Sequence, residues 1–187
     1  MKSFMETDAA AADAGLFAAL DRATLEQEFD RLLAANGPAL ARLAATYTNM
    51  PSDRDDLLQE IALAVWQALR RFRGECSART FLFRIAHNRA IAHLARSRTH
   101  RAAAVEVANV HDPAPDPESG LAREQTTQRL RGAIQRLPLI YRQVIMLALE
   151  DLEYGEIAQV LGITESNVGA RLSRARQLLR DLLESGT

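Results

Sequence analysis

The chain has 187 residues, of which 48% are hydrophobic and 25% are charged, with 23 basic against 24 acidic side chains. This composition excludes a disordered chain, which would be less apolar, and a membrane protein, since no run approaches the ~20 apolar residues of a membrane span. Asp8 and Asp13 interrupt the apolar residues that follow Lys2, so we expect no secretory signal. The single cysteine, Cys76, excludes an internal disulfide and favours a reducing, cytoplasmic compartment.

The net charge of −1 is distributed unevenly along the chain. Residues 1–35 hold three basic and seven acidic side chains (net −4), residues 70–101 hold nine arginines and one acid (net +8), and residues 123–187 hold nine arginines and eight acids (net +1). Arginine accounts for 22 of the 23 basic residues. A coding bias toward arginine and a functional need explain that ratio equally well. The coding bias does not explain why the arginines are clustered. Because the planar guanidinium binds phosphates and base edges, the basic stretch indicates a nucleic-acid partner.

Apolar residues recur at helical spacing through the first hundred residues. We expect a helix over about 25–35 that ends at Asn36-Gly37-Pro38, and a second that continues through Tyr47. A third should begin at a cap formed by Ser52 or Asp53 and end before Gly74, and a fourth should cover about 79–98.

The composition changes between residues 102 and 122, where three of the six prolines lie within 113–117. Proline cannot donate helical hydrogen bonds, so this segment predicts an extended linker. The predicted fold is all-α, with two small helical domains joined by a Pro-rich linker. The expected parts are an N-terminal extension (1–20), a first domain (21–101), the linker (102–122) and a second domain (123–187).

The second domain carries a helix-turn-helix pattern. A helix over about 121–137 is followed by one that Pro138 can open, then by a short helix to Leu161, the turn Gly162-Ile163-Thr164, and a long helix over 165–183. In a DNA major groove, the long helix would bring Ser166, Asn167 and Arg174 to base edges or phosphates. A helical hairpin without a nucleic-acid role is the alternative.

Four motifs occur in order along the chain. They are DLLQEIALAVW at 56–66, FRGE at 72–75 with RTFLFRIAHNRAI at 79–91, LPLIYRQVI at 137–145, and EIA at 156–158 with RLSRAR at 171–176. In this order and spacing the chain resembles the bacterial RNA polymerase sigma factors of the extracytoplasmic-function group. The resemblance covers about residues 35–183, and it implies sigma region 2 in the first domain and sigma region 4 in the second.

The resemblance implies three binding surfaces. The first motif would dock on core RNA polymerase through Asp56, Leu57, Gln59 and Glu60. The first domain would also recognise and melt the minus-ten promoter element, and the residues for this are Arg73, Arg79, Phe83, Arg84, Asn88 and Arg98. The helix-turn-helix would read the minus-thirty-five element through Ser166, Asn167, Arg171 and Arg174.

Spacing supports part of this assignment and leaves part open. Residues 84, 87, 88, 91, 95 and 98 fall on one helix face, where arginines can hold phosphates and Asn88 can donate to and accept from a base. Melting needs an unstacked base to find a pocket, and a base stacked on an aromatic ring gains about 1–3 kcal/mol. Phe83 is the candidate for that ring, whereas Phe81 serves partly in the core. Arg171 has the alternative of pairing with Glu156.

No nucleophile–base arrangement, phosphate-binding glycine loop or metal-spaced ligand set stands out, so we expect neither an enzyme nor a cofactor or metal. Cys76 has two interpretations, an inert thiol and a redox switch. The resemblance implies core RNA polymerase, promoter DNA and an anti-sigma protein as partners, without membrane insertion. The rival functions are an autonomous helix-turn-helix regulator and a helical adaptor that does not contact DNA.

Overall fold

The computed structural model describes residues 22–103 and 121–184, with side chains placed within 22–97 and 126–184. These ranges contain helices and no strand, which confirms the all-α prediction. The predicted linker and the N-terminal extension lie almost wholly outside the described residues. The helices are α2 (Arg22–Tyr47), α3 (Pro51–Leu69), α4 (Ala78–Ala103), α5 (Leu121–Arg136), α6 (Leu139–Leu149), α7 (Tyr154–Leu161) and α8 (Glu165–Glu184).

Helix α2 is continuous, so the prediction that it ends at Asn36-Gly37-Pro38 is wrong. Pro38 lies inside the helix and removes one backbone donor. The next turn nevertheless buries Leu40 and Leu43, which are 3% and 1% exposed. Burial of two leucines offers several kcal/mol, enough to outweigh the proline penalty of about 3 kcal/mol. Tertiary packing therefore carries the helix through a local break signal.

Helix α3 also begins differently from the prediction. Its N-cap is Met50, which makes no side-chain cap, and Pro51 occupies the first helical position. Proline suits that position because the amide it lacks would have no helical partner. Ser52 and Asp53 therefore lie inside the first turn rather than at the cap. In the first turn the carboxylate of Asp53 interacts favourably with the positive end of the helix dipole.

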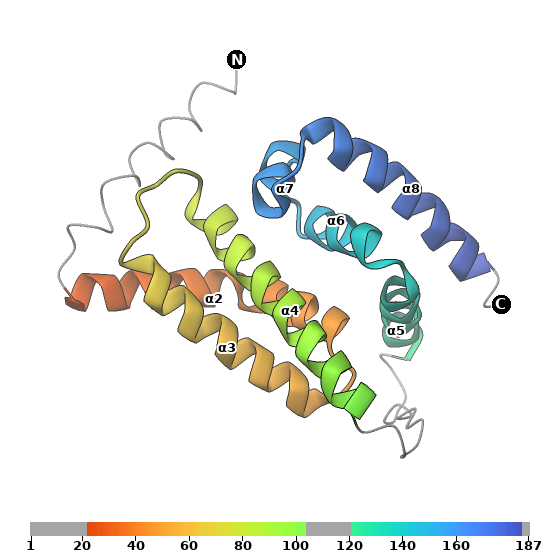
Figure 1. The fold of residues 1–187 in the computed structure, drawn as a ribbon, viewed down its shortest axis with the longest axis horizontal. Helices are drawn as coiled ribbons and strands as arrows, with labels where there is room; N and C mark the ends of the chain where they lie inside the picture. The colour runs from red at the N-terminus through yellow and green to blue at the C-terminus, as the bar shows by residue number, and fades with distance from the viewer. Residues whose placement is uncertain (1–21, 104–120, 185–187) are drawn as a thin grey trace.

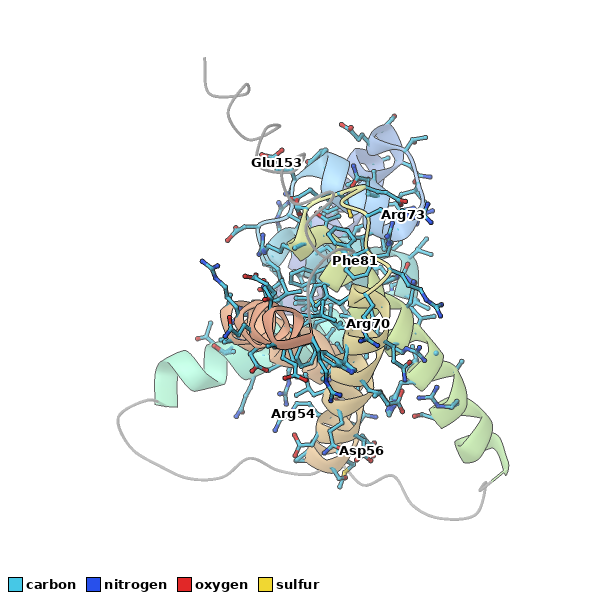
Figure 2. All side chains as sticks on the ribbon, turned by 90° about the vertical axis from the view of Figure 1, so that its left-hand side faces the viewer. Arg54, Asp56, Arg70, Arg73, Phe81 and Glu153 are labelled. Carbon is cyan, nitrogen blue, oxygen red and sulfur yellow. The ribbon has the colours of Figure 1, made fainter. Side chains whose placement is uncertain are left out.

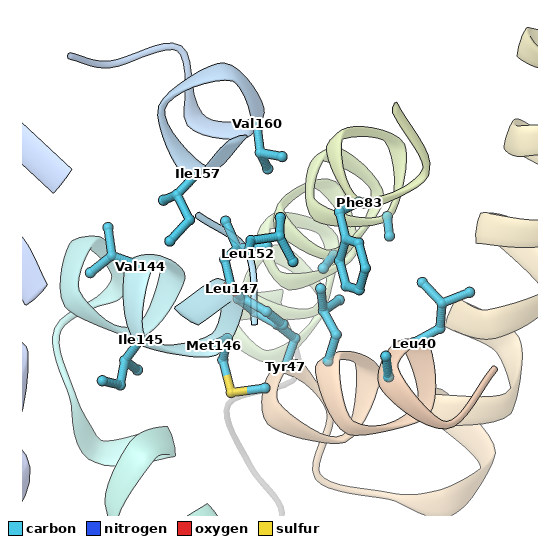
Figure 3. Packing of buried hydrophobic residues seen from close by; sticks show 14 of the residues in the cluster. Leu40, Tyr47, Phe83, Val144, Ile145, Met146, Leu147, Leu152, Ile157 and Val160 are labelled. Carbon is cyan, nitrogen blue, oxygen red and sulfur yellow. The ribbon is translucent and has the colours of Figure 1, made fainter. Parts of the chain in front are cut away.

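The two groups of helices share one hydrophobic core. Helices α2, α3 and α4 form one group and α5–α8 the other. Contacts between the groups join α4 to α7 and α2 to α5, and Figure 1 shows α7 near the start of α4. Leu40 of α2, Phe83 of α4, Leu147 of α6 and Ile157 of α7 belong to the same buried cluster. Figure 3 shows side chains from both groups pointing into this cluster. The two halves are thus packed together rather than held apart by the linker.

The helix-turn-helix has well-defined local signals. Glu153 and Glu156 form a reciprocal capping box at the start of α7. Gly162 ends that helix with φ 65°, a left-handed conformation that glycine adopts without steric cost. The amide of Asn167 donates to Oγ1 of Thr164 at 3.3 Å, which caps α8 as the sequence predicts. These caps fix the conformation of the turn between α7 and α8, and so the orientation of α8.

Candidate functional site

Helix α3 presents an exposed strip, here called the α3 surface, made of Asp56, Gln59, Leu63 and Gln67. The residues are three or four apart, so they lie on one side of the helix. Leu63 is 58% exposed, the largest exposed fraction among the large hydrophobic residues that the structure describes as exposed. An exposed leucine among polar side chains suits a protein interface. Leu63 belongs to the first motif, but sequence reasoning missed its exposure.

Two of the residues predicted to dock on polymerase make contacts within the protein instead. Leu57 is fully buried in the core, so the prediction that it touches a partner is wrong for this structure. Glu60 accepts two hydrogen bonds from Nη2 of Arg96, at 2.7 and 2.6 Å, and so ties α3 to α4. Asp56 and Gln59 remain exposed. Figure 2 shows Asp56 near one end of α3, with Arg70 and Arg73 beyond the other end.

The predicted minus-ten residues divide into two groups. Arg73 and Asn88 are exposed, and Arg84 is half-buried with Cζ 5.7 Å from the ring centroid of Phe81. That position holds the guanidinium by a cation–π contact at the protein surface. Arg98 lies on α4, but its side chain is outside those described. These residues fit a surface that contacts phosphates and bases.

The other group faces the second half of the chain. Phe83 is fully buried, and its ring points into the shared cluster (Figure 3), so the prediction of an exposed stacking wall is wrong for this arrangement. Arg79 packs with Cζ 5.4 Å from that ring and donates through Nη2 to the backbone oxygen of Glu150. His87, which is predicted to share the DNA-facing side of α4, is 6% exposed with Nε2 3.4 Å from Nε2 of Gln143, so that prediction is wrong for this arrangement. The reason is packing by α6 and α7, which the spacing within α4 cannot reveal.

Helix α8 presents its predicted face to solvent. Ser166, Asn167 and Arg174 are exposed, while Val168 and Leu172 are fully buried beneath them. Arg171 donates through Nε to Oδ1 of Asn167 at 2.8 Å, so the alternative pairing with Glu156 is wrong. Glu156 instead accepts from Thr80 of α4 at 2.7 Å. The Arg171–Asn167 contact orders two polar side chains side by side on the helix surface.

The described residues contain no group of three or more His, Cys, Asp or Glu placed to hold a metal ion. Cys76 is half-buried, and burial raises the pKa of its thiol, which opposes the thiolate form that a reactive cysteine needs. The described helices also include none long and apolar enough to cross a bilayer.

Comparison with known proteins decides the family. Residues 32–100 match the family model of sigma-70 region 2, and residues 127–179 match that of sigma-70 region 4. The chain belongs to the sigma-70 family. The extracytoplasmic-function sigma factor SigM of Mycobacterium tuberculosis is 30% identical over 157 residues, covering 83% of this chain and 76% of that protein. The sigma factor NccH of Alcaligenes xylosoxydans is 32% identical over 163 residues, covering 84% and 87%.

Solved structures agree with this assignment. The sigma factor CnrH, solved in complex with the cytosolic domain of CnrY, superposes with a TM-score of 0.69 and 27% identity, covering 96% of this chain and 99% of CnrH. The present chain is therefore a sigma factor of the extracytoplasmic-function group, which directs RNA polymerase to promoters. The comparisons do not favour an autonomous helix-turn-helix regulator. Sigma factors are generally not enzymes.

Proposed function

We propose that the three surfaces described above divide the work of the sigma factor. Residues 21–101 act as the region 2 domain that docks on polymerase and opens the minus-ten element, and residues 123–187 act as the region 4 domain that reads the minus-thirty-five element. The observation that carries the proposal is the exposure of Asn88 on α4 and of Ser166, Asn167 and Arg174 on α8 within the two segments that match sigma regions.

The α3 surface is the docking site for core polymerase. Asp56 and Gln59 supply polar and acidic groups, which suit a basic helical partner and orient it. Leu63 supplies the apolar contact that such an interface needs at its centre. Glu60 acts through Arg96 instead, holding α4 in a fixed position beside the docked polymerase.

Helix α4 and the loop before it contact the minus-ten element. Arg73, Arg84 and Arg98 hold phosphates, and Asn88 reads or stabilises an extruded base. The aromatic support next to Arg84 is Phe81, which is 7% exposed and packs on Phe72 with ring centroids 4.4 Å apart. The two packed rings support the guanidinium of Arg84 and do not offer an exposed surface on which a base could stack.

Helix α8 lies in the major groove of the minus-thirty-five element. Ser166 and Asn167 belong to its first turn, where the N-terminus of a recognition helix meets base edges. Arg174, two turns later, holds a phosphate or a base edge. Arg171 orients Asn167 through their 2.8 Å hydrogen bond.

The remaining partners follow from the same assignment. An anti-sigma protein that masks these surfaces is supported by CnrH, which was solved with CnrY bound. We place the protein in the cytoplasm with the polymerase that it serves, and we assign no catalytic chemistry to the chain itself.

The test is transcription by core polymerase on a library of genomic fragments, with and without the purified protein. We expect initiation at a defined set of promoters, which also identifies their sequence. The variant Arg84→Ala with Asn88→Ala should lose initiation on duplex promoters and regain it on pre-melted templates, whereas Arg22→Ala, which breaks an exposed ion pair within α2, should behave as wild type. Unchanged initiation by the double variant would refute the melting role of α4.

A further inference from the structure

We propose that the protein binds a medium-chain aliphatic carboxylate in a pocket bounded by α2, α3, α5 and α6. The pocket has a volume of about 410 Å³. That lies within the range of about 300–1,000 Å³ that is typical of small-molecule sites. The inference goes beyond the proposed function and does not depend on it.

Small side chains on α2 create the space. Ala41 and Ala45 both line the pocket, and because they are four residues apart they lie on the same side of the helix. Gln135 of α5 donates through Nε2 to the backbone oxygen of Ala45 at 2.9 Å, which holds α5 close to this side of α2. The two methyl groups therefore leave a hollow of fixed width between the helices.

The opposite walls of the pocket are apolar. Leu130 and Ile134 of α5 and Met146 and Leu149 of α6 line it. Leu149 is 49% exposed, so a ligand chain that covers it removes apolar surface from water. No aromatic ring is found among the lining side chains, all of which belong to the described part of the chain. A flexible aliphatic chain suits such walls better than a ring that needs a stacking partner.

Two arginines lie together at one end of the pocket. Arg54 of α3 and Arg131 of α5 line the pocket, and both also line an adjoining recess of about 50 Å³ beside Met50. Met146 and Leu149 border the pocket but not the recess, so the arginines and the apolar wall of α6 lie apart. A few convergent polar groups in an apolar pocket fix the orientation of a ligand. Guanidinium groups from two helices are suited to a carboxylate.

The charges around the pocket favour an anion. Glu150 supplies a carboxylate to the lining, but it already accepts from Nε of Arg42 at 2.8 Å and from Nη2 at 2.6 Å. Arg54 lies 3.7 Å from a carboxylate oxygen of Asp55, whose side chain is 65% exposed, and an ion pair of this kind contributes little. Arg131 makes no ion pair within the described side chains. Arg54 and Arg131 can therefore pair with a ligand.

The experiment uses the full chain labelled with carbon-13 at the methionine methyl groups. The chain has four methionines, and Met146 lines the pocket, so its methyl signal in nuclear magnetic resonance spectra reports on the site. The variant Met146→Leu identifies that signal. Decanoate is titrated below its micelle concentration, beside 1-decanol, which has the chain without the charge, and acetate, which has the charge without the chain.

We expect decanoate to shift the Met146 signal saturably, 1-decanol to bind about tenfold more weakly, and acetate to have no effect. Arg54→Ala and Arg131→Ala should each weaken decanoate binding about tenfold and leave 1-decanol binding unchanged. The matched control is Arg136→Ala, which removes an exposed arginine of the same helix, α5, that does not line the pocket. It should match the wild type.

Unchanged 1-decanol binding shows that the pocket is intact in each arginine variant, and circular dichroism checks the helical content. Four results would overturn the proposal: no saturable shift of Met146, equal affinity for decanoate and 1-decanol, full decanoate affinity in both arginine variants, or an equal loss in Arg136→Ala. Loss of 1-decanol binding in both arginine variants would also overturn it. Promoter-dependent initiation by core polymerase is measured separately, so its failure refutes the proposed function and leaves the carboxylate site standing.

Discussion

His87 is a buried titratable group at the contact between α4 and α6. It is 6% exposed, and burial lowers its pKa from 6.5 to about 4. When a base has a lower pKa in the folded state than in the unfolded state, the unfolded state binds more protons as the pH falls, and the free energy of unfolding decreases. The contribution of His87 to folding is therefore complete above its ordinary pKa of 6.5 and is lost as the pH falls toward about 4.

The size of the effect follows from that pKa difference. At about 1.36 kcal/mol per unit, the full change from 6.5 to about 4 amounts to about 3 kcal/mol. Between about pH 7 and about pH 5 the loss is about 2 kcal/mol, since the unfolded imidazole is mostly protonated at the lower pH and the folded one is still mostly neutral. For a chain of this kind that is a large share of the total free energy of unfolding.

The assay is urea unfolding at both pH values for the wild type and for His87→Gln. Glutamine keeps a polar side chain near Gln143 but does not titrate. Both proteins have the same carboxylates, so the effect of carboxylate titration on stability cancels when the two proteins are compared. We expect the free energy of unfolding of the wild type to fall by about 2 kcal/mol more than that of the variant. A difference below about 0.5 kcal/mol would refute the burial of His87 as a neutral imidazole.

Three further predictions concern other positions. Phe83→Ala should lower the free energy of unfolding by about 3–5 kcal/mol because the ring is fully buried, and a loss below about 1 kcal/mol in urea would show that the ring is exposed. Gly162→Ala places a Cβ at φ 65° and should cost about 1 kcal/mol of stability, measured by thermal unfolding, and weaken initiation at promoters that depend on the minus-thirty-five element; an unchanged melting temperature would contradict this. Leu63→Asp should leave stability within about 0.5 kcal/mol and abolish binding to core polymerase in a pull-down, whereas Leu63→Met should bind; full binding by the aspartate variant would remove the docking role of the α3 surface.

Features with a local cause could be predicted from the sequence. The helix-turn-helix depends on signals that lie within a few residues of one another, such as Thr164 at the cap of α8 and Gly162 after α7, and both occupy the predicted positions. The exposed face of α8 follows from the spacing of Val168 and Leu172, which are buried on the other side. Local periodicity is sufficient there because one side of α8 meets the core and the other meets solvent.

Features that depend on distant packing could not be predicted. His87 and Asn88 are adjacent on α4, yet one is buried and the other exposed. The difference comes from α6, more than fifty residues later, which brings Gln143 to His87. The motifs predict that Phe83 and Leu57 contact partners, but both side chains pack in the protein's own core. Continuation of α2 through Pro38 has the same cause, since the buried leucines that follow outweigh a local signal.

The clustered arginines of residues 70–101 also look different once their partners are known. Arg79 donates to the backbone oxygen of Glu150, and Arg96 is held by the carboxylate of Glu60. A guanidinium already engaged by an acceptor must give up that contact before it can bind a phosphate, so the net charge of +8 overstates the field that DNA meets. Breaking these contacts reduces what Arg79 and Arg96 gain from a phosphate, so the acceptors of each arginine, and not the net charge alone, set the DNA affinity of the basic stretch.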